Sequence, residues 1–167
     1  SSNTQHCNII TTFQLAPLSN YYLRKFISPF SIRYPRGTGS IVNWRNEFSE
    51  VVIGKGRKLK SGDDIAVLSV GAIGTEAQKG ISKVEKKGIS VAHYDMRFVK
   101  PLDETMLHEI FGRFKSIITV EDGTIQGGFG SAVIEWMAEQ GYNSRVTRLG
   151  VPDRWIEHGT QAELYAE

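Results

Sequence analysis

This sequence is poor in the features that mark disulfide-rich, membrane-spanning and nucleic-acid-binding proteins. A single cysteine, Cys7, excludes an internal disulfide framework and a cysteine-rich metal site, and it fits a reducing compartment. No apolar run reaches the roughly 18 residues that a helix needs to cross a bilayer, and the first residues lack the pattern of a signal peptide. The 20 basic and 18 acidic residues are interspersed, so charge makes no case for nucleic acid or an anionic membrane as a main partner.

The composition is that of an ordinary globular protein. Of the 167 residues, 40% are apolar and 23% are charged, which argues against wholesale disorder. This length suffices for one compact domain with a real hydrophobic core, plus a tail.

From Asp63 onward, strand-like and helix-like segments alternate. Four segments predict strands, and the first and third are nearly continuous apolar runs, as expected when both faces of a sheet are covered. The predicted strands are residues 65–70, 89–94, 116–121 and 145–149.

Three amphipathic helices are predicted between these strands, each with apolar residues at the spacing of one helical face. Asp103 stands where the N-cap of the second helix belongs, after Pro101, and Gly88 and Gly141 follow the first and third helices as stop residues. The apolar stripes are Ile73, Ala77, Ile81 and Val84; Leu107, Ile110, Phe111 and Phe114; and Phe129, Val133, Trp136 and Met137.

Strand–helix alternation with about 25 residues per repeat predicts right-handed crossovers and a parallel sheet. We expect a three-layer α/β/α fold with a mostly parallel five-stranded sheet. Residues 50–55 are expected to form a further strand, for which an edge of the sheet is one place. A terminal helix is expected over residues 160–167. Upstream, residues 31–34 predict a short strand that Pro35 ends, and residues 37–49 a linker.

Two glycine-bearing turns after predicted strands are candidates for anion binding. Gly71-Ala-Ile-Gly74 stands where nucleotide-binding folds place a phosphate loop, but it lacks the spacing of a dinucleotide fingerprint or a P-loop, which favours a plain tight turn. Gly127, Gly128 and Gly130 leave backbone N–H groups at a helix start, where an anion can bind, and they equally allow close packing of helix on sheet. Packing is the favoured interpretation.

An acidic pair and a histidine are candidates for acid–base or metal chemistry. Glu121 and Asp122 end a predicted strand at the edge where α/β sheets often bind ligands, but no lysine or histidine is near in sequence, so a solvated or turn-capping role is favoured. His158 precedes the predicted terminal helix without a second histidine at metal-ligand spacing. We expect it to cap that helix or to form a hydrogen bond.

Two arginines flank the end of the short upstream strand. Arg33 and Arg36 lie three residues apart in Arg-Tyr-Pro-Arg-Gly, and a guanidinium is well suited to bidentate recognition of phosphate. Taken alone, the pattern favours surface ion pairing.

Six phrases occur in a fixed order along the chain: Arg33-Tyr-Pro-Arg-Gly37, Gly54-Lys-Gly56, Asp95-Met-Arg-Phe-Val-Lys-Pro-Leu-Asp103, Thr119-Val-Glu-Asp-Gly123, Gly127-Gly-Phe-Gly130 and Val151-Pro-Asp-Arg-Trp-Ile-Glu-His-Gly-Thr-Gln161. Each is weak by itself, whereas the ordered set is specific. Together they resemble the C-terminal third of the 1-deoxy-D-xylulose-5-phosphate synthases, thiamin-diphosphate-dependent enzymes of the transketolase-like family. The resemblance covers about residues 30–167.

The resemblance implies a C-terminal fragment of three parts: residues 1–37 as a remnant of the pyrimidine-binding domain, 38–49 as a linker and 50–167 as a transketolase C-terminal domain. Enzymes of this family are transferases that condense pyruvate with glyceraldehyde 3-phosphate, release carbon dioxide and form 1-deoxy-D-xylulose 5-phosphate. The product feeds isoprenoid, thiamin and pyridoxal synthesis. A homodimer in the bacterial cytoplasm, or in a plastid, is implied.

The full-length enzymes use thiamin diphosphate and Mg²⁺, but their Gly-Asp-Gly…Asn motif, their cofactor-activating glutamate and their channel histidines are missing from this sequence. We therefore expect no catalytic, cofactor-binding or metal-binding residue in the fragment. It should be inactive alone and should support the dimer and the neighbouring domain, with small-molecule substrates bound by the whole enzyme. The resemblance assigns one site residue, Arg36, to the phosphate of the aldehyde substrate.

Two alternatives stay open at this point. The C-terminal domain of a 2-oxo-acid dehydrogenase β-subunit shares this fold, although residues 152–159 favour the synthase. A non-catalytic nucleotide-binding or regulatory α/β module is the other, with the Gly71–Gly74 turn as its binding site.

Overall fold

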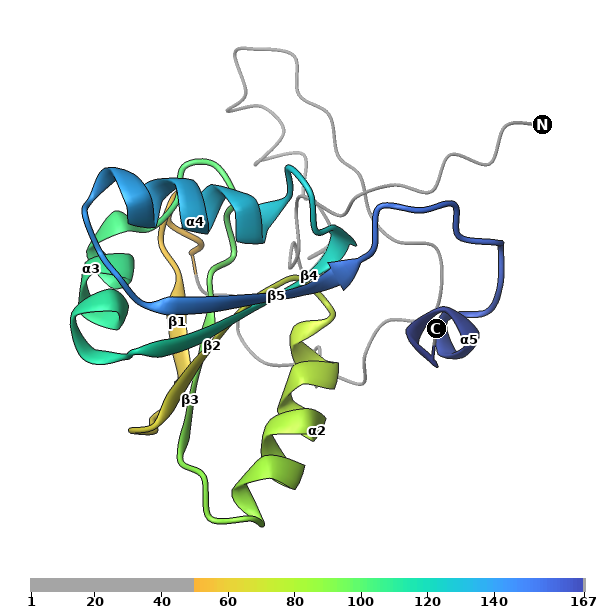
Figure 1. Ribbon diagram of the computed structural model, residues 1–167, viewed down its shortest axis with the longest axis horizontal. Helices are drawn as coiled ribbons and strands as arrows, with labels where there is room; N and C mark the ends of the chain where they lie inside the picture. Colours follow the sequence, from red (N-terminus) through yellow and green to blue (C-terminus); the bar gives the residue numbers. More distant parts are fainter. Residues whose placement is uncertain (1–49, 167) are drawn as a thin grey trace.

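The structure is a computed structural model and describes residues 50–166. The five strands form one sheet in the order β1-β3-β2-β4-β5 (Figure 1). β1 runs antiparallel to β3, and all other neighbours run parallel. In chain order the elements are β1 (Arg57–Lys60), β2 (Ile65–Val70), α2 (Gly74–Glu85), β3 (Val91–Asp95), α3 (Glu104–Arg113), β4 (Ser116–Thr124), α4 (Phe129–Glu139), β5 (Arg145–Val151) and α5 (Gln161–Ala166).

The sheet lies between two helical layers, which confirms the predicted α/β/α fold. α3 and α4 cover one face and α2 covers the other (Figure 1). Because side chains alternate along a strand, Leu68 faces the α3–α4 layer while its neighbour Val67 faces α2. The α3–α4 side holds the larger core, with the aromatic rings of Tyr94, Phe111 and Phe129 fully or almost fully buried.

The predicted strands and helix ends lie close to the observed ones, except that β4 continues to Thr124. Glu121 and Asp122, predicted to end this strand, therefore lie within it. β3 begins two residues later than predicted because Ser90 is engaged before it: its backbone N–H donates to the Asp64 carboxylate at 2.7 Å and its carbonyl accepts from Asp64 N–H at 2.9 Å. Gly88 and Gly141 adopt φ angles of 84° and 71° just beyond α2 and α4, as predicted for stop residues.

The strand predicted over residues 50–55 is wrong. Gly54 has a φ of 69° within a turn closed by a hydrogen bond of 3.1 Å from Lys55 N–H to Val52 C=O. Pairing with β3 starts only at Arg57, so the edge strand is β1 instead. The left-handed conformation of Gly54, which glycine adopts readily, ends an extended run at this turn.

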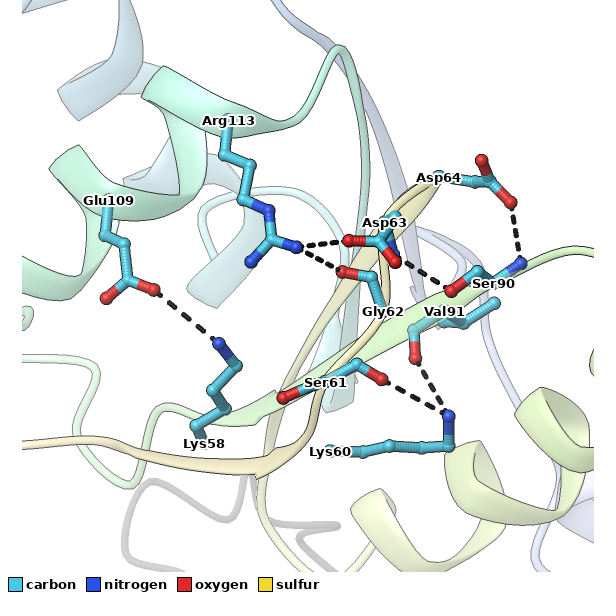
Figure 2. A network of polar contacts seen from close by, with 10 residues as sticks. All are labelled: Lys58, Lys60, Ser61, Gly62, Asp63, Asp64, Ser90, Val91, Glu109 and Arg113. Carbon is cyan, nitrogen blue, oxygen red and sulfur yellow. Dashed lines mark hydrogen bonds and ion pairs between the residues drawn. The ribbon is translucent and has the colours of Figure 1, made fainter.

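The turn between β1 and β2 is fastened to two other elements (Figure 2). Arg113, the last residue of α3, donates to the Gly62 carbonyl at 3.1 Å and forms an ion pair with Asp63. A side chain at Gly62 would place its Cβ 2.1 Å from the carbonyl carbon of Val91, so only glycine lets this turn pass the start of β3. Lys58 adds an ion pair to α3. The edge strand is thus held mainly by polar contacts.

Candidate functional site

The carboxyl ends of β2, β3, β4 and β5 meet at one edge of the sheet. The chain leaves β2 for β3 on one side and then passes to β4 on the other, so the direction of winding reverses between β2 and β4. Ligands of α/β sheets bind at such a reversal, outside the carboxyl ends of the strands. Residues 71–74, 95–103 and 121–130, all singled out from the sequence, contain the loops at this edge together with the strand and helix ends that flank them.

The turn between β4 and α4 is closed by its own carboxylate. Glu121 is 5% exposed, and its two oxygens accept hydrogen bonds from Phe129 N–H at 2.7 Å and Gly130 N–H at 2.8 Å. These are the helix-start donors that an external anion would need. The capping role considered for the acidic pair is therefore confirmed for Glu121, and the solvated role is wrong for it.

Close packing explains two of the three glycines of this turn, whereas Gly127 has a φ of 70° and no atom within 4 Å of the position a Cβ would take. A Cβ at Gly128 would lie 2.2 Å from both the Glu121 carboxylate and the Thr124 carbonyl oxygen, and one at Gly130 would lie 2.5 Å from the hydroxyl of Thr119. The packing interpretation is confirmed for Gly128 and Gly130 but not for Gly127, and the anion-binding one fails because Glu121 accepts from the N–H groups of Phe129 and Gly130. Asp122 is half-buried and points to the opposite face of β4 from Glu121.

Arg148 on β5 braces the same turn and was not singled out from the sequence. Its guanidinium donates to the Ile125 carbonyl at 2.6 Å and to the Ser131 hydroxyl at 2.7 Å. Ser131 in turn accepts from Gly127 N–H at 3.0 Å and donates to Ile125 C=O at 3.1 Å. Only the register of β5 against β4 brings Arg148 here, and nothing local in the sequence indicates that contact.

The loop between β3 and α3 is pinned at its far end by Asp103. This buried carboxylate caps α3 through Met106 N–H at 3.2 Å, as predicted, and also accepts from Gly56 N–H at 3.0 Å and Lys55 Nζ at 3.2 Å. Burial alone would raise the pKa of the Asp103 carboxyl. The backbone hydrogen bonds and Lys55 more than offset burial and hold that pKa below its usual value.

Asp95 pins the near end of the same loop. It is 7% exposed; one oxygen accepts from Arg57 Nε at 2.9 Å and the other from Arg97 N–H at 3.2 Å. Both aspartates of the phrase 95–103 thus hold residues 55–57, about 40 positions earlier in the chain. Spacing along the sequence could not reveal this pairing.

A buried histidine lies beneath this loop. His93 is 1% exposed, its Nε2 lies 2.8 Å from the Ser69 hydroxyl, and its Nδ1 has no hydrogen-bond partner. Burial lowers the pKa of His93, and the negative charge of Asp95 offsets part of that effect. Ser69 is equally buried, so the pair has no access to a substrate.

The Gly71–Gly74 turn is a tight turn, as favoured, because Gly74 N–H donates to Gly71 C=O at 3.0 Å. His158 is exposed and does not cap α5. Thr160 does: its hydroxyl accepts from Glu163 N–H at 3.4 Å, and its own N–H donates to the Glu163 carboxylate at 2.7 Å.

Arg36, with Arg33, the short upstream strand and the linker, lies outside the described residues. Among residues 50–166, no three His, Cys, Asp or Glu side chains gather in a way that could hold a metal ion. Within that same stretch, no helix is long and apolar enough to cross a membrane.

Comparison with known proteins places the chain in a domain family. The family model described as "Transketolase, C-terminal domain" matches residues 54–167. The chain is 57% identical over 145 residues to the 1-deoxy-D-xylulose-5-phosphate synthase of Cytophaga hutchinsonii and 59% identical over 140 residues to that of Parabacteroides distasonis. These alignments cover 87% and 84% of this chain but 23% and 22% of the two relatives. The chain thus spans about a quarter of the length of the curated relatives it matches.

A solved structure agrees with the fold. The chain is similar to a structure described as a split gene transketolase, inactive β4 tetramer, with a TM-score of 0.66 and 29% identity, over 78% of this chain and 42% of that one.

Proposed function

Because this chain belongs to the transketolase C-terminal domain family, we propose that it is the C-terminal part of a 1-deoxy-D-xylulose-5-phosphate synthase. The whole enzyme would condense pyruvate with glyceraldehyde 3-phosphate, release carbon dioxide and supply isoprenoid, thiamin and pyridoxal synthesis from the cytoplasm. The observation that carries this is the identity of more than half of the aligned residues with synthases along most of the chain.

The chain itself is proposed to be catalytically silent. The complete enzyme would use thiamin diphosphate and Mg²⁺, but the glycine turn of this domain does not fit a diphosphate: the Glu121 carboxylate already fills the N–H groups of Phe129 and Gly130 and would repel a second anion. Residues 50–167 would serve as a rigid domain that supports a homodimer and its neighbouring domain. Residues 1–37 and 38–49 would be the remnant of that neighbour and the linker.

Two rival functions have less support. The Gly71–Gly74 turn spends the N–H groups of Gly74 and Thr75 on carbonyls of the turn itself, which counts against a nucleotide-binding module. The named relatives are synthases rather than 2-oxo-acid dehydrogenase subunits.

Arg36 is proposed as the residue of this chain that contacts substrate, through the phosphate of the aldehyde. A guanidinium fork matches phosphate, and the phrase around Arg36 is one of the six by which the sequence resembles the synthases.

A chimeric enzyme tests the proposed synthase activity of the whole enzyme and the proposed inactivity of the isolated chain. This chain replaces the matched quarter of the Parabacteroides distasonis synthase, and product is followed by NMR from ¹³C-pyruvate with thiamin diphosphate and Mg²⁺. We expect product from the chimera and none from the isolated chain. Product from the isolated chain, or a folded chimera that makes none, would contradict the proposal.

In the same chimera, Arg36→Ala should raise the KM for glyceraldehyde 3-phosphate on the order of ten- to a hundredfold, because a charge-assisted hydrogen bond is worth about 1.5–3 kcal/mol. The KM for pyruvate should stay nearly unchanged. Arg33→Ala is the matched control, and equal effects on both substrates would assign Arg36 a structural role.

A further inference from the structure

The two edges of the sheet that residues 50–166 form differ in how well they are protected against a further strand. β1 carries three cations in four residues, and its register with β3 shifts between Lys58 and Lys60. Lysine and irregular pairing keep an edge strand from accepting another strand. β5, the other edge, has neither device: residues 145–149 pair with β4 in uninterrupted register, and the strand contains no lysine or proline. β5 is therefore the edge that is open to pairing.

The outer backbone groups of β5 have no strand beside them within the described residues. Arg145 N–H donates inward to Lys115 C=O at 2.8 Å, and Val151 C=O accepts inward from Ile125 N–H at 3.0 Å. Since the backbone groups of successive residues point to opposite sides of a strand, every second residue between Arg145 and Val151 directs its N–H and C=O away from β4. These outward-pointing residues are Val146, Arg148 and Gly150.

An exposed apolar side chain and two exposed charges lie along this edge. Leu149 is 50% exposed and lies beside Val120 on the α2 side of the sheet. Arg145 begins the strand and Asp153 stands just beyond its end; both are exposed, and neither forms an ion pair with another residue between 50 and 166. Leu149 is midway between them in the sequence. A strand with this order is complementary to a copy of itself that runs in the opposite direction.

We propose that β5 pairs antiparallel with β5 of a second copy of this chain, about a two-fold axis at Leu149, so that the two sheets become one. Leu149 then meets its own copy, and Arg145 comes level with Asp153 of the second copy at both ends of the pair. The proposal names a surface for the homodimer proposed above and rests on that homodimer.

The neighbouring registers are less favourable. With Arg148 on the axis, two arginines would face each other directly, and like charges in that position are destabilising. With Thr147 on the axis, Leu149 would face the charged Arg145 of the second copy. With Leu149 on the axis, Arg148 faces Gly150 of the second copy instead. These two residues point outward, so they exchange both backbone hydrogen bonds on each side of the axis.

A cysteine at the axis tests the pairing directly. The full chain carrying Cys7→Ser and Leu149→Cys is mildly oxidised and run on a non-reducing gel. In an antiparallel pair that lacks hydrogen bonds, opposite Cα atoms are about 4.5 Å apart, which a disulfide can span. We therefore expect a covalent dimer that a thiol reductant dissolves.

Thr147→Cys in the same Cys7→Ser background is the matched control. Thr147 is exposed and lies on the same face of β5, but the two copies of residue 147 would be about 13 Å apart, because each stands two residues from the axis. This variant should stay uncrosslinked. Equal cross-linking of both variants, or none in Leu149→Cys, would overturn the proposal.

Charge reversal tests the ends of the pair. In sedimentation equilibrium of the full chain, Arg145→Glu and Asp153→Lys should each raise the dissociation constant of the dimer at least about threefold, because an exposed ion pair is lost at both ends. The double variant restores opposite charges and should recover most of the affinity. A double variant as weak as the single ones, or a wild-type chain that sediments as a monomer at its highest soluble concentration, would contradict the pairing.

The cross-link and the synthase activity can fail separately. In the chimera, a cross-link that appears only with Leu149→Cys upholds the β5 pairing even where no product forms, and that result contradicts the synthase assignment alone. Product from a chimera whose Leu149→Cys variant does not cross-link overturns the β5 pairing and leaves the synthase assignment in place.

Discussion

The two loops at the carboxyl edge of the sheet are both held by buried carboxylates, but these carboxylates accept hydrogen bonds from different parts of the chain. In the β4–α4 turn, Glu121 binds the N–H groups of the helix that follows it, so the turn is closed on itself. In the β3–α3 loop, Asp95 and Asp103 bind residues 55–57 from a distant part of the sequence. A buried carboxylate at this edge of the sheet is therefore not by itself a sign of catalysis. The donors that a carboxylate binds decide whether it closes its own loop or holds a distant segment of the chain.

Removal of the closing carboxylate should have the largest effect. Glu121→Ala leaves two buried N–H groups of α4 without an acceptor and should lower the free energy of unfolding by about 3 kcal/mol, measured by urea denaturation at pH 7. Glu121→Gln keeps one acceptor oxygen and should lose about half as much.

The matched control for this change is Glu139→Ala, an exposed residue at the other end of α4, which should alter stability by less than about 0.5 kcal/mol. A loss below about 1 kcal/mol for Glu121→Ala would mean that the turn is not closed by its carboxylate.

Breaking the contacts of the β3–α3 loop should lower the free energy of unfolding by less. Asp103→Ala removes the N-cap of α3 and the hold on Gly56 and Lys55, and it should cost about 2 kcal/mol. The pKa of the folded carboxyl lies below its unfolded value near 3.9, so its contribution is present above that pH and is lost as the pH falls through the folded pKa.

Denaturation of wild type and Asp103→Ala from pH 7 to pH 2.5 checks both statements, because the two stability curves should converge in acid. Exposed Asp153→Ala serves as the control. Parallel curves across the whole range would show that the carboxylate charge has no part in holding the loop.

The smallest expected effect on stability concerns His93, on β3. Burial lowers the pKa of this histidine in the folded protein, so the unfolded chain binds the proton more readily. Stability is then full above the unfolded pKa near 6.5 and falls as the pH drops below it, by no more than about 1.4 kcal/mol per pH unit.

Urea denaturation between pH 7.5 and 5.5 should show this slope in the wild type and a smaller one in His93→Gln. The exposed His108 is the matched control, and its replacement by glutamine should leave the slope in place. An unchanged slope in His93→Gln would assign the acid sensitivity to other groups.

Much of the fold was predictable because buried strands and helices have apolar residues at regular spacing in the sequence. β2 and the start of β4 are apolar runs, and the stripe of Phe129, Val133 and Trp136 is the buried face of α4. β1 has no such apolar pattern. Its sequence Arg-Lys-Leu-Lys is exposed along its whole length, and its strand pairing with β3 is supported by ion pairs. The apolar pattern therefore wrongly favoured residues 50–55.

The candidate site was less predictable because its contacts join residues far apart in the chain. The N-cap role of Asp103 follows from local spacing, whereas its bond to Gly56 spans 47 positions. Likewise, no local pattern distinguishes Arg148, which braces a turn on a neighbouring strand. The phosphate role of Arg36 stays a prediction.

The sequence by itself indicated the family through six ordered phrases. Its order of apolar and glycine residues determined the parallel sheet and the ends of the helices, because local conformation and one-sided burial act over a few neighbouring positions. Only the tertiary structure decided which carboxylate meets which donor. Register and crossover bring Glu121 to the start of its own helix and Asp95 to the edge strand, and a hydrogen bond forms between atoms that meet in space, however far apart they are in the chain.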